Sequence, residues 1–237
     1  MISTLRSVYA WALFGLILLP VFILAQAEAA VHALRGSRRD GLRRRVAKGL
    51  SLYARLSPLY DFRVEGREHL PRSGPYVLVA NHESLLDPLC LFLLELPVRI
   101  LASDRALRVP VVSTLFRACE HIGVDRSDPG SRKRALDTAC SALEAGTPVA
   151  IFPEGQLPDT PGELATFHNG AFVAAQSCRV PIVPVVLSGT GRAWAPDTVV
   201  VTGRHEIGVR VLPPLDPGDG DAAALTQKVR TLMTRPD

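Results

Sequence analysis

A histidine and an aspartate lie five positions apart in the stretch VLVANHESLLDP, residues 77–88. The imidazole of His82 can remove a proton near neutral pH. The carboxylate of Asp87, bonded to the other ring nitrogen, would fix the tautomer and stabilise the imidazolium. The two residues could therefore serve as a general base and its partner. Such a pair alone is common, and Asp87, which precedes Pro88, could equally be a helix N-cap.

An arginine also follows an apolar run. Arg126 ends the segment GVDR and stands shortly before Asp128-Pro129, a typical helix start. A guanidinium beside a helix N-terminus can bind an anion. The alternative is a surface arginine paired with Asp125 or Asp128.

A third candidate, Glu154, stands between Pro153 and Gly155 after another apolar run. Its carboxylate could orient a hydroxyl group or a neighbouring cation, although the flanking residues are also typical of a plain turn. No Gly-x-Ser-x-Gly motif is present, and Ser84 lies inside the His–Asp loop, so we expect no covalent nucleophile. The four cysteines are single and widely spaced, which indicates buried thiols in a reducing compartment and no metal site.

The elements that must position these residues alternate along the chain. Apolar runs predict strands at residues 76–80, 98–102, 149–152, 182–187, 199–201 and 207–212, and helical patterns predict helices at 88–96, 109–119, 129–144, 171–178 and 221–234. This alternation is typical of an α/β fold with a mostly parallel sheet flanked by helices. Since the carboxyl ends of parallel strands meet at one edge, we expect His82 and Glu154 on the same rim.

An uncharged apolar segment, residues 8–25, precedes this body and has the minimum length for a membrane-spanning helix. A cleaved signal peptide is the alternative, but the apolar part is longer than the ~7–15 residues usual for one. Only Arg6 precedes the segment, whereas a run of basic residues follows it. The positive-inside rule therefore predicts a membrane anchor with the body on the cytoplasmic face.

A basic amphipathic helix is predicted at residues 41–57, where apolar residues recur every three or four positions with arginines between them. This helix could lie among lipid headgroups with its apolar face in the membrane. Alternatively, it could pack on the body and expose its charged face to solvent.

The positive charge is concentrated at the N-terminus. Residues 1–60 hold nine Lys and Arg against two acids, whereas the remainder is net acidic. Because the basic residues adjoin an apolar segment, they indicate anionic lipid rather than nucleic acid. We expect two parts: a membrane anchor and basic arm at 1–60, and a single catalytic domain at 61–237.

Four segments together resemble one family. Asn81-His82-x-x-x-x-Asp87, GVDR at 123–126, FPEG at 152–155 and VPIVP at 180–184 are similar to the 1-acylglycerol-3-phosphate O-acyltransferase family of glycerolipid acyltransferases. The resemblance runs from about Tyr60 to Leu212. It implies direct attack by a lipid hydroxyl on acyl-CoA or acyl-carrier protein, with no cofactor and no metal.

The resemblance also implies site residues. His82 and Asp87 would be catalytic, and the residues that bind substrate would be Asn81, Arg126, Glu154 and Gly155, with Arg126 on the phosphate of the acceptor. Two positions depart from the family pattern, because Ser103-Asp104 and Gln156-Leu157 replace residues that are usually cationic or polar. Arg105 and Arg108 are near enough in sequence to bind phosphate in their place.

The function expected from these features is acyl transfer to a lysophospholipid, with 1-acylglycerol-3-phosphate as the leading acceptor and phosphatidic acid as the product. One alternative is an acyltransferase for a different lysolipid, including an aminolipid. Another is a non-catalytic membrane protein that binds lipid on the same fold. Loss of function on removing the His82 imidazole would separate the enzyme from the binding protein.

Overall fold

The computed structural model describes residues 2–103, 110–125, 127–158, 163–193 and 204–234. Within them, seven strands form one sheet in the order β1-β7-β6-β2-β5-β3-β4. Every neighbouring pair is parallel except β6 and β7. The strands are β1 (Tyr60–Glu65), β2 (Val77–Ala80), β3 (Arg99–Ser103), β4 (Ile122–Val124), β5 (Val149–Ile151), β6 (Ile182–Ser188) and β7 (His205–Val211). The mostly parallel α/β fold is thus confirmed, and the strand expected at 199–201 lies outside the described residues.

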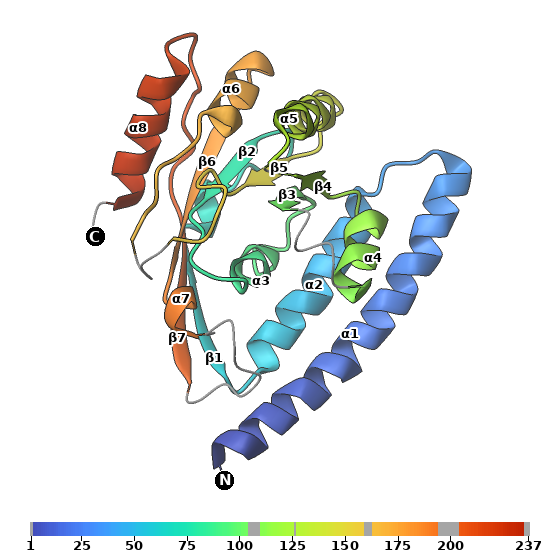
Figure 1. Cartoon of the computed structure of the whole chain (residues 1–237). Helices are drawn as coiled ribbons and strands as arrows, with labels where there is room; N and C mark the ends of the chain where they lie inside the picture. The colour runs from blue at the N-terminus through green and yellow to red at the C-terminus, as the bar shows by residue number, and fades with distance from the viewer. Residues whose placement is uncertain (1, 104–109, 126, 159–162, 194–203, 235–237) are drawn as a thin grey trace.

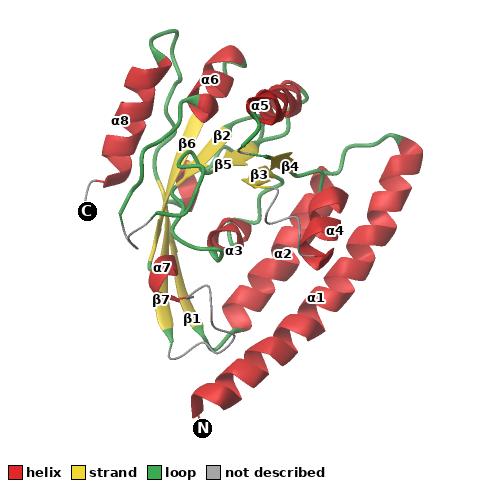
Figure 2. Ribbon diagram, in the orientation of Figure 1, coloured by secondary structure: helices red, strands yellow, loops and turns green. Residues whose placement is uncertain are grey.

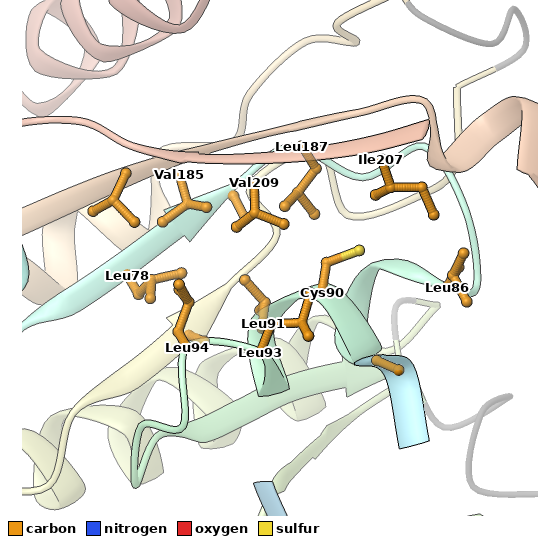
Figure 3. Close-up of a cluster of buried hydrophobic side chains, with 14 of the residues drawn as sticks. Leu78, Leu86, Cys90, Leu91, Leu93, Leu94, Val185, Leu187, Ile207 and Val209 are labelled. Atoms are coloured by element: carbon orange, nitrogen blue, oxygen red, sulfur yellow. The ribbon is translucent and has the colours of Figure 1, made fainter. Parts of the chain in front are cut away.

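Helices cover both faces of the sheet (Figures 1 and 2). One face packs against α2 (Asp40–Leu56) and α3 (Asp87–Phe92), and the other against α5 (Pro129–Glu144), α6 (Gly170–Ser177) and α8 (Ala222–Thr234). Three further helices are η1 (Arg67–His69), α4 (Pro110–Ala118) and α7 (Thr190–Ala193). Figure 3 shows Cys90 and Leu91 of α3 facing Val185, Leu187 and Val209 of the sheet.

The central strand β2 is apolar along its whole length because it is covered on both faces. Its four residues are each 0% exposed. A strand buried in this way has no solvent face and shows no polar alternation. The first polar residue after it, Asn81, marks the point where the chain leaves the sheet, and the candidate site begins there.

The N-terminal helix α1 (Ile2–Arg35) is longer than the expected segment and packs on the body along one face. Leu18 and Ala25 join a buried cluster with Leu42 and Val46 of α2. The contact is close, since a Cβ on Gly49 would clash with a methyl group of Val21.

The opposite face of α1 is apolar and open. Leu16, Leu19 and Ile23 are 73%, 61% and 57% exposed. The segment Val8–Arg35, which contains an 18-residue window with a mean hydropathy of 2.4, is the one candidate membrane span within the described residues. An exposed stripe of large apolar side chains indicates a surface that meets lipid or another partner.

The helix α2 is amphipathic and basic, as predicted, but its apolar face is occupied. Leu42, Val46 and Leu50 are buried in one cluster with residues of α1 and with Cys119 and Leu89 of the catalytic domain, so the helix packs on the body, as in the second alternative. Arg43 is a correction to the expected basic face. Its side chain is 3% exposed, and it donates from Nε to Pro97 O at 3.0 Å and from Nη1 to Cys119 O at 3.1 Å.

Candidate active site

The loop after β2 is fixed to the neighbouring strand by Asn81. Its Oδ1 accepts the backbone N–H of Leu187 at 2.7 Å, and its Nδ2 donates to Leu187 O at 2.9 Å. The side chain therefore continues the pairing of β2 with β6 beyond the end of the strand. Asn81 is 3% exposed and holds the loop in place, and the substrate-binding role implied by the resemblance stays a prediction.

His82 and Asp87 are in direct contact, as predicted. His82 Nδ1 lies 2.7 Å from Oδ2 of Asp87, whose side chain is 0% exposed. Because an ionised carboxylate only accepts hydrogen bonds, Nδ1 carries the proton and Nε2 of the neutral ring is left with its lone pair. The ring is 12% exposed and stacks on Phe152, with centroids 4.5 Å apart.

Asp87 also shapes the loop that contains His82. The same oxygen, Oδ2, accepts the backbone N–H groups of Glu83 at 2.6 Å and Ser84 at 2.8 Å. The alternative that Asp87 is a helix N-cap is wrong, because α3 begins at Asp87 and Leu86 is its N-cap residue. Three N–H donors thus converge on one buried carboxylate oxygen and fix the loop around it.

Glu154 is brought to the same place from β5. It is 2% exposed, its Oε1 accepts the backbone N–H of His82 at 2.8 Å, and its Oε2 accepts that of Ala165 at 2.8 Å. Burial raises the pKa of this carboxyl, while the N–H donors of His82 and Ala165 act in the opposite direction. Both oxygens bond to the main chain, so Glu154 orients the His82 loop, and the substrate-binding role implied by the resemblance stays a prediction.

Gly155 is required by the turn that follows. Its φ is +69°, a conformation that side-chain-bearing residues rarely adopt, and a Cβ there would lie 3.3 Å from the His168 ring. The glycine thus lets the chain reverse beside Glu154. The substrate-binding role implied by the resemblance stays a prediction.

Sequence reasoning did not single out Glu83, whose carboxylate faces α7. Its Oε2 lies 3.4 Å from Thr190 Oγ1 and from the N–H of Gly191, and burial raises the pKa of its carboxyl. No local sequence signal could have predicted this, since the partners lie more than 100 positions away along the chain. Glu83 connects the His–Asp loop to the segment after β6.

The predicted phosphate ligands Arg126, Arg105 and Arg108 lie outside the described residues. Their expected surroundings are partly described. Asp128 accepts the N–H groups of Gly130 at 2.8 Å and Ser131 at 3.0 Å and so caps α5. The helix start that the sequence predicts at Asp128-Pro129 is thus confirmed.

These contacts define the class of the protein: an α/β enzyme with a buried His–Asp pair at the carboxyl edge of a central parallel strand. Residues 61–188 match the family described as acyltransferase. The chain belongs to that family, and the predicted resemblance is confirmed.

Two relatives are named 1-acyl-sn-glycerol-3-phosphate acyltransferases. One from Chlamydomonas reinhardtii is 30% identical over 192 residues, which cover 81% of this chain and 57% of the relative. The alpha form from Mus musculus is 31% identical over 227 residues, which cover 90% of this chain and 75% of the relative. The chain thus spans little more than half of the algal protein.

The fold has a solved counterpart. The crystal structure of the 1-acyl-sn-glycerophosphate acyltransferase PlsC from Thermotoga maritima aligns with a TM-score of 0.75 at 22% identity, covering 98% of this chain and 94% of that one. This likeness extends the agreement beyond residues 61–188 to the N-terminal helices.

Proposed function

We propose that the protein transfers an acyl chain from a thioester, acyl-CoA or acyl-carrier protein, to the free hydroxyl of 1-acylglycerol-3-phosphate, giving phosphatidic acid. The observation that carries the proposal is the 2.7 Å contact between His82 Nδ1 and the buried carboxylate of Asp87, which leaves Nε2 as a base. The names of the two relatives support the choice of acceptor.

The reaction follows from that geometry. Nε2 of His82 takes the proton of the acceptor hydroxyl as its oxygen attacks the thioester carbonyl carbon. The tetrahedral intermediate collapses with breakage of the C–S bond, and the leaving sulfur receives the proton from the imidazolium. Asp87 stabilises the imidazolium until this proton is transferred, and Glu154 holds the main chain of His82 in place. No covalent bond to the protein is needed.

The acceptor is a membrane lipid, and α1 is the element suited to bind the enzyme to the membrane that contains it. The open apolar face of α1 would enter the bilayer and the catalytic domain would lie on the cytoplasmic side, in keeping with the basic residues that follow the apolar segment. Arg44 and Lys48 are exposed cations that could bind anionic headgroups, whereas Arg45 is ion-paired with Glu28 of α1.

The test is an acyl-transfer assay with the detergent-solubilised full-length protein. Labelled acyl-CoA and acyl-carrier protein are each offered with 1-acylglycerol-3-phosphate, and with lysolipids whose phosphate is esterified or that carry an amine. The proposal predicts labelled phosphatidic acid with at least one donor. Transfer to none of these lysolipids by folded protein would contradict it, and a clear preference for another lysolipid would contradict the choice of acceptor.

A further inference from the structure

The half-buried cation Arg230 on α8 faces the loop between β5 and α6. Its Nη2 donates to Leu164 O at 2.9 Å and its Nε to Ala165 O at 3.2 Å. Figure 1 shows α8 on the outer side of this loop, next to α6. Within the described residues no carboxylate pairs with Arg230, so its charge is directed at the main chain.

A single peptide group connects Arg230 to Glu154. The carbonyl of Leu164 and the N–H of Ala165 belong to the same peptide bond, and that N–H donates to Oε2 of Glu154 at 2.8 Å. The peptide dipole therefore has its oxygen at a cation and its N–H at an anion. Hydrogen bonds aligned in this way strengthen one another. The other oxygen of Glu154 accepts the N–H of His82.

We propose that Arg230 is a positioning residue for His82, acting through the Leu164–Ala165 peptide and Glu154. The ring of His82 is fixed on one side by Asp87, but its main chain is held by Glu154. A buried carboxylate keeps its charge only if donors surround it, and the peptide oriented by Arg230 supplies one of the two. The inference deepens the proposed function and rests on it.

Arg230→Ala should lower kcat by about 10- to 100-fold, because displacing a catalytic group such as His82 by about 1 Å can reduce the rate by up to about 100-fold. The KM values of the acyl donor and the acceptor should each change by less than about threefold, since Arg230 touches neither substrate. Arg230→Lys should recover part of the loss, because an ammonium can reach one carbonyl but lacks the planar fork. The control is Lys228→Ala, which removes an exposed cation from the same helix.

A double variant separates positioning from general destabilisation. If both residues act through one peptide, Arg230→Ala together with Glu154→Gln should lose less than the product of the two single losses. Multiplicative losses, or a kcat fall in Arg230→Ala that is matched by Lys228→Ala, would overturn the proposal. So would a fall accounted for by the unfolded fraction at the assay temperature.

Hydrogen exchange gives a readout that does not depend on turnover. The proposal predicts faster exchange at the amides of His82 and Ala165 in Arg230→Ala and no change in Lys228→Ala. If the wild-type protein transferred no acyl group, the proposed function would fail, yet this measurement would still decide the coupling. Unchanged exchange at His82 in Arg230→Ala would overturn the coupling even in a fully active enzyme.

Discussion

The variant Asp87→Asn removes the negative charge behind His82 while keeping the shape of the side chain. Oδ2 of Asp87 accepts three donors, His82 Nδ1 and the N–H groups of Glu83 and Ser84. An amide oxygen can still accept them, but it stabilises the imidazolium far less. Loss of that stabilisation should reduce kcat by about 100- to 10,000-fold, the range seen when a general base loses its partner or tautomer.

The structure also predicts a stability cost. Oδ1 of Asp87 is buried, and no residue in the described part of the chain bonds to it. In Asp87→Asn the amide nitrogen takes this place and becomes a buried donor without an acceptor, which costs about 1–3 kcal/mol. The opposite orientation of the amide would place its nitrogen against the three donors, which would destabilise the folded protein further. The midpoint temperature of thermal unfolding should therefore fall, and the kinetic assay should be run well below the midpoint of the variant.

The measurement compares initial rates of phosphatidic acid formation for the wild type, Asp87→Asn and Asp137→Asn, which removes an exposed carboxylate of α5. Asp137→Asn should be indistinguishable from the wild type in both rate and unfolding. The reasoning is refuted if folded Asp87→Asn retains turnover within about threefold of the wild type, because the carboxylate charge would then contribute too little to count as general-base support.

Three further outcomes are expected. Burial lowers the pKa of His121 to about 3, and its Nδ1 accepts the N–H of Ile100. Because this histidine takes up a proton near pH 6.5 in the unfolded chain but not in the folded one, the free energy of unfolding should fall below that pH by up to about 1.4 kcal/mol per pH unit. His121→Asn should reduce this pH dependence in unfolding measurements. Arg126→Ala should raise the KM of the acceptor and leave that of the acyl donor, an expectation that equal changes in steady-state kinetics would contradict. Leu16→Asp with Leu19→Asp should release the folded protein from membranes on sedimentation, whereas high salt should not release the wild type.

The elements set by local signals were predictable. The helix α5 has the expected bounds because Asp128 supplies its cap and Pro129 its first turn. The edge strand β1 was not predicted, although Phe62 and Val64 alternate with charged residues as a half-exposed strand requires. The alternation of apolar and polar residues is typical of a strand, but a search for continuous apolar runs does not detect it.

The positions of the site residues were predictable only in part. The contact of His82 with Asp87 follows from a short loop, so spacing sufficed. The roles of Asn81 and Glu154 do not follow from spacing, since their partners lie 106 and 72 positions away. Only the sheet order, which places β6 and β5 on either side of β2, brings these partners to the loop.

The N-terminal arm shows why an amphipathic pattern does not identify its partner. The apolar stripe of α2 fits a lipid surface and a packed helix equally well, and α1 covers it. Arg43 has the same ambiguity, because a guanidinium among apolar residues can bind a phosphate or the backbone carbonyls of neighbouring segments. In this fold it takes the carbonyls of Pro97 and Cys119.

The central claim is that His82 is the base in acyl transfer. The most direct test measures labelled phosphatidic acid formed from 1-acylglycerol-3-phosphate by the wild type and by His82→Ala, each shown to be folded and to bind the acceptor. The account predicts that turnover in His82→Ala falls by about 100- to 10,000-fold while acceptor binding is retained. Undiminished turnover in the folded variant would contradict it.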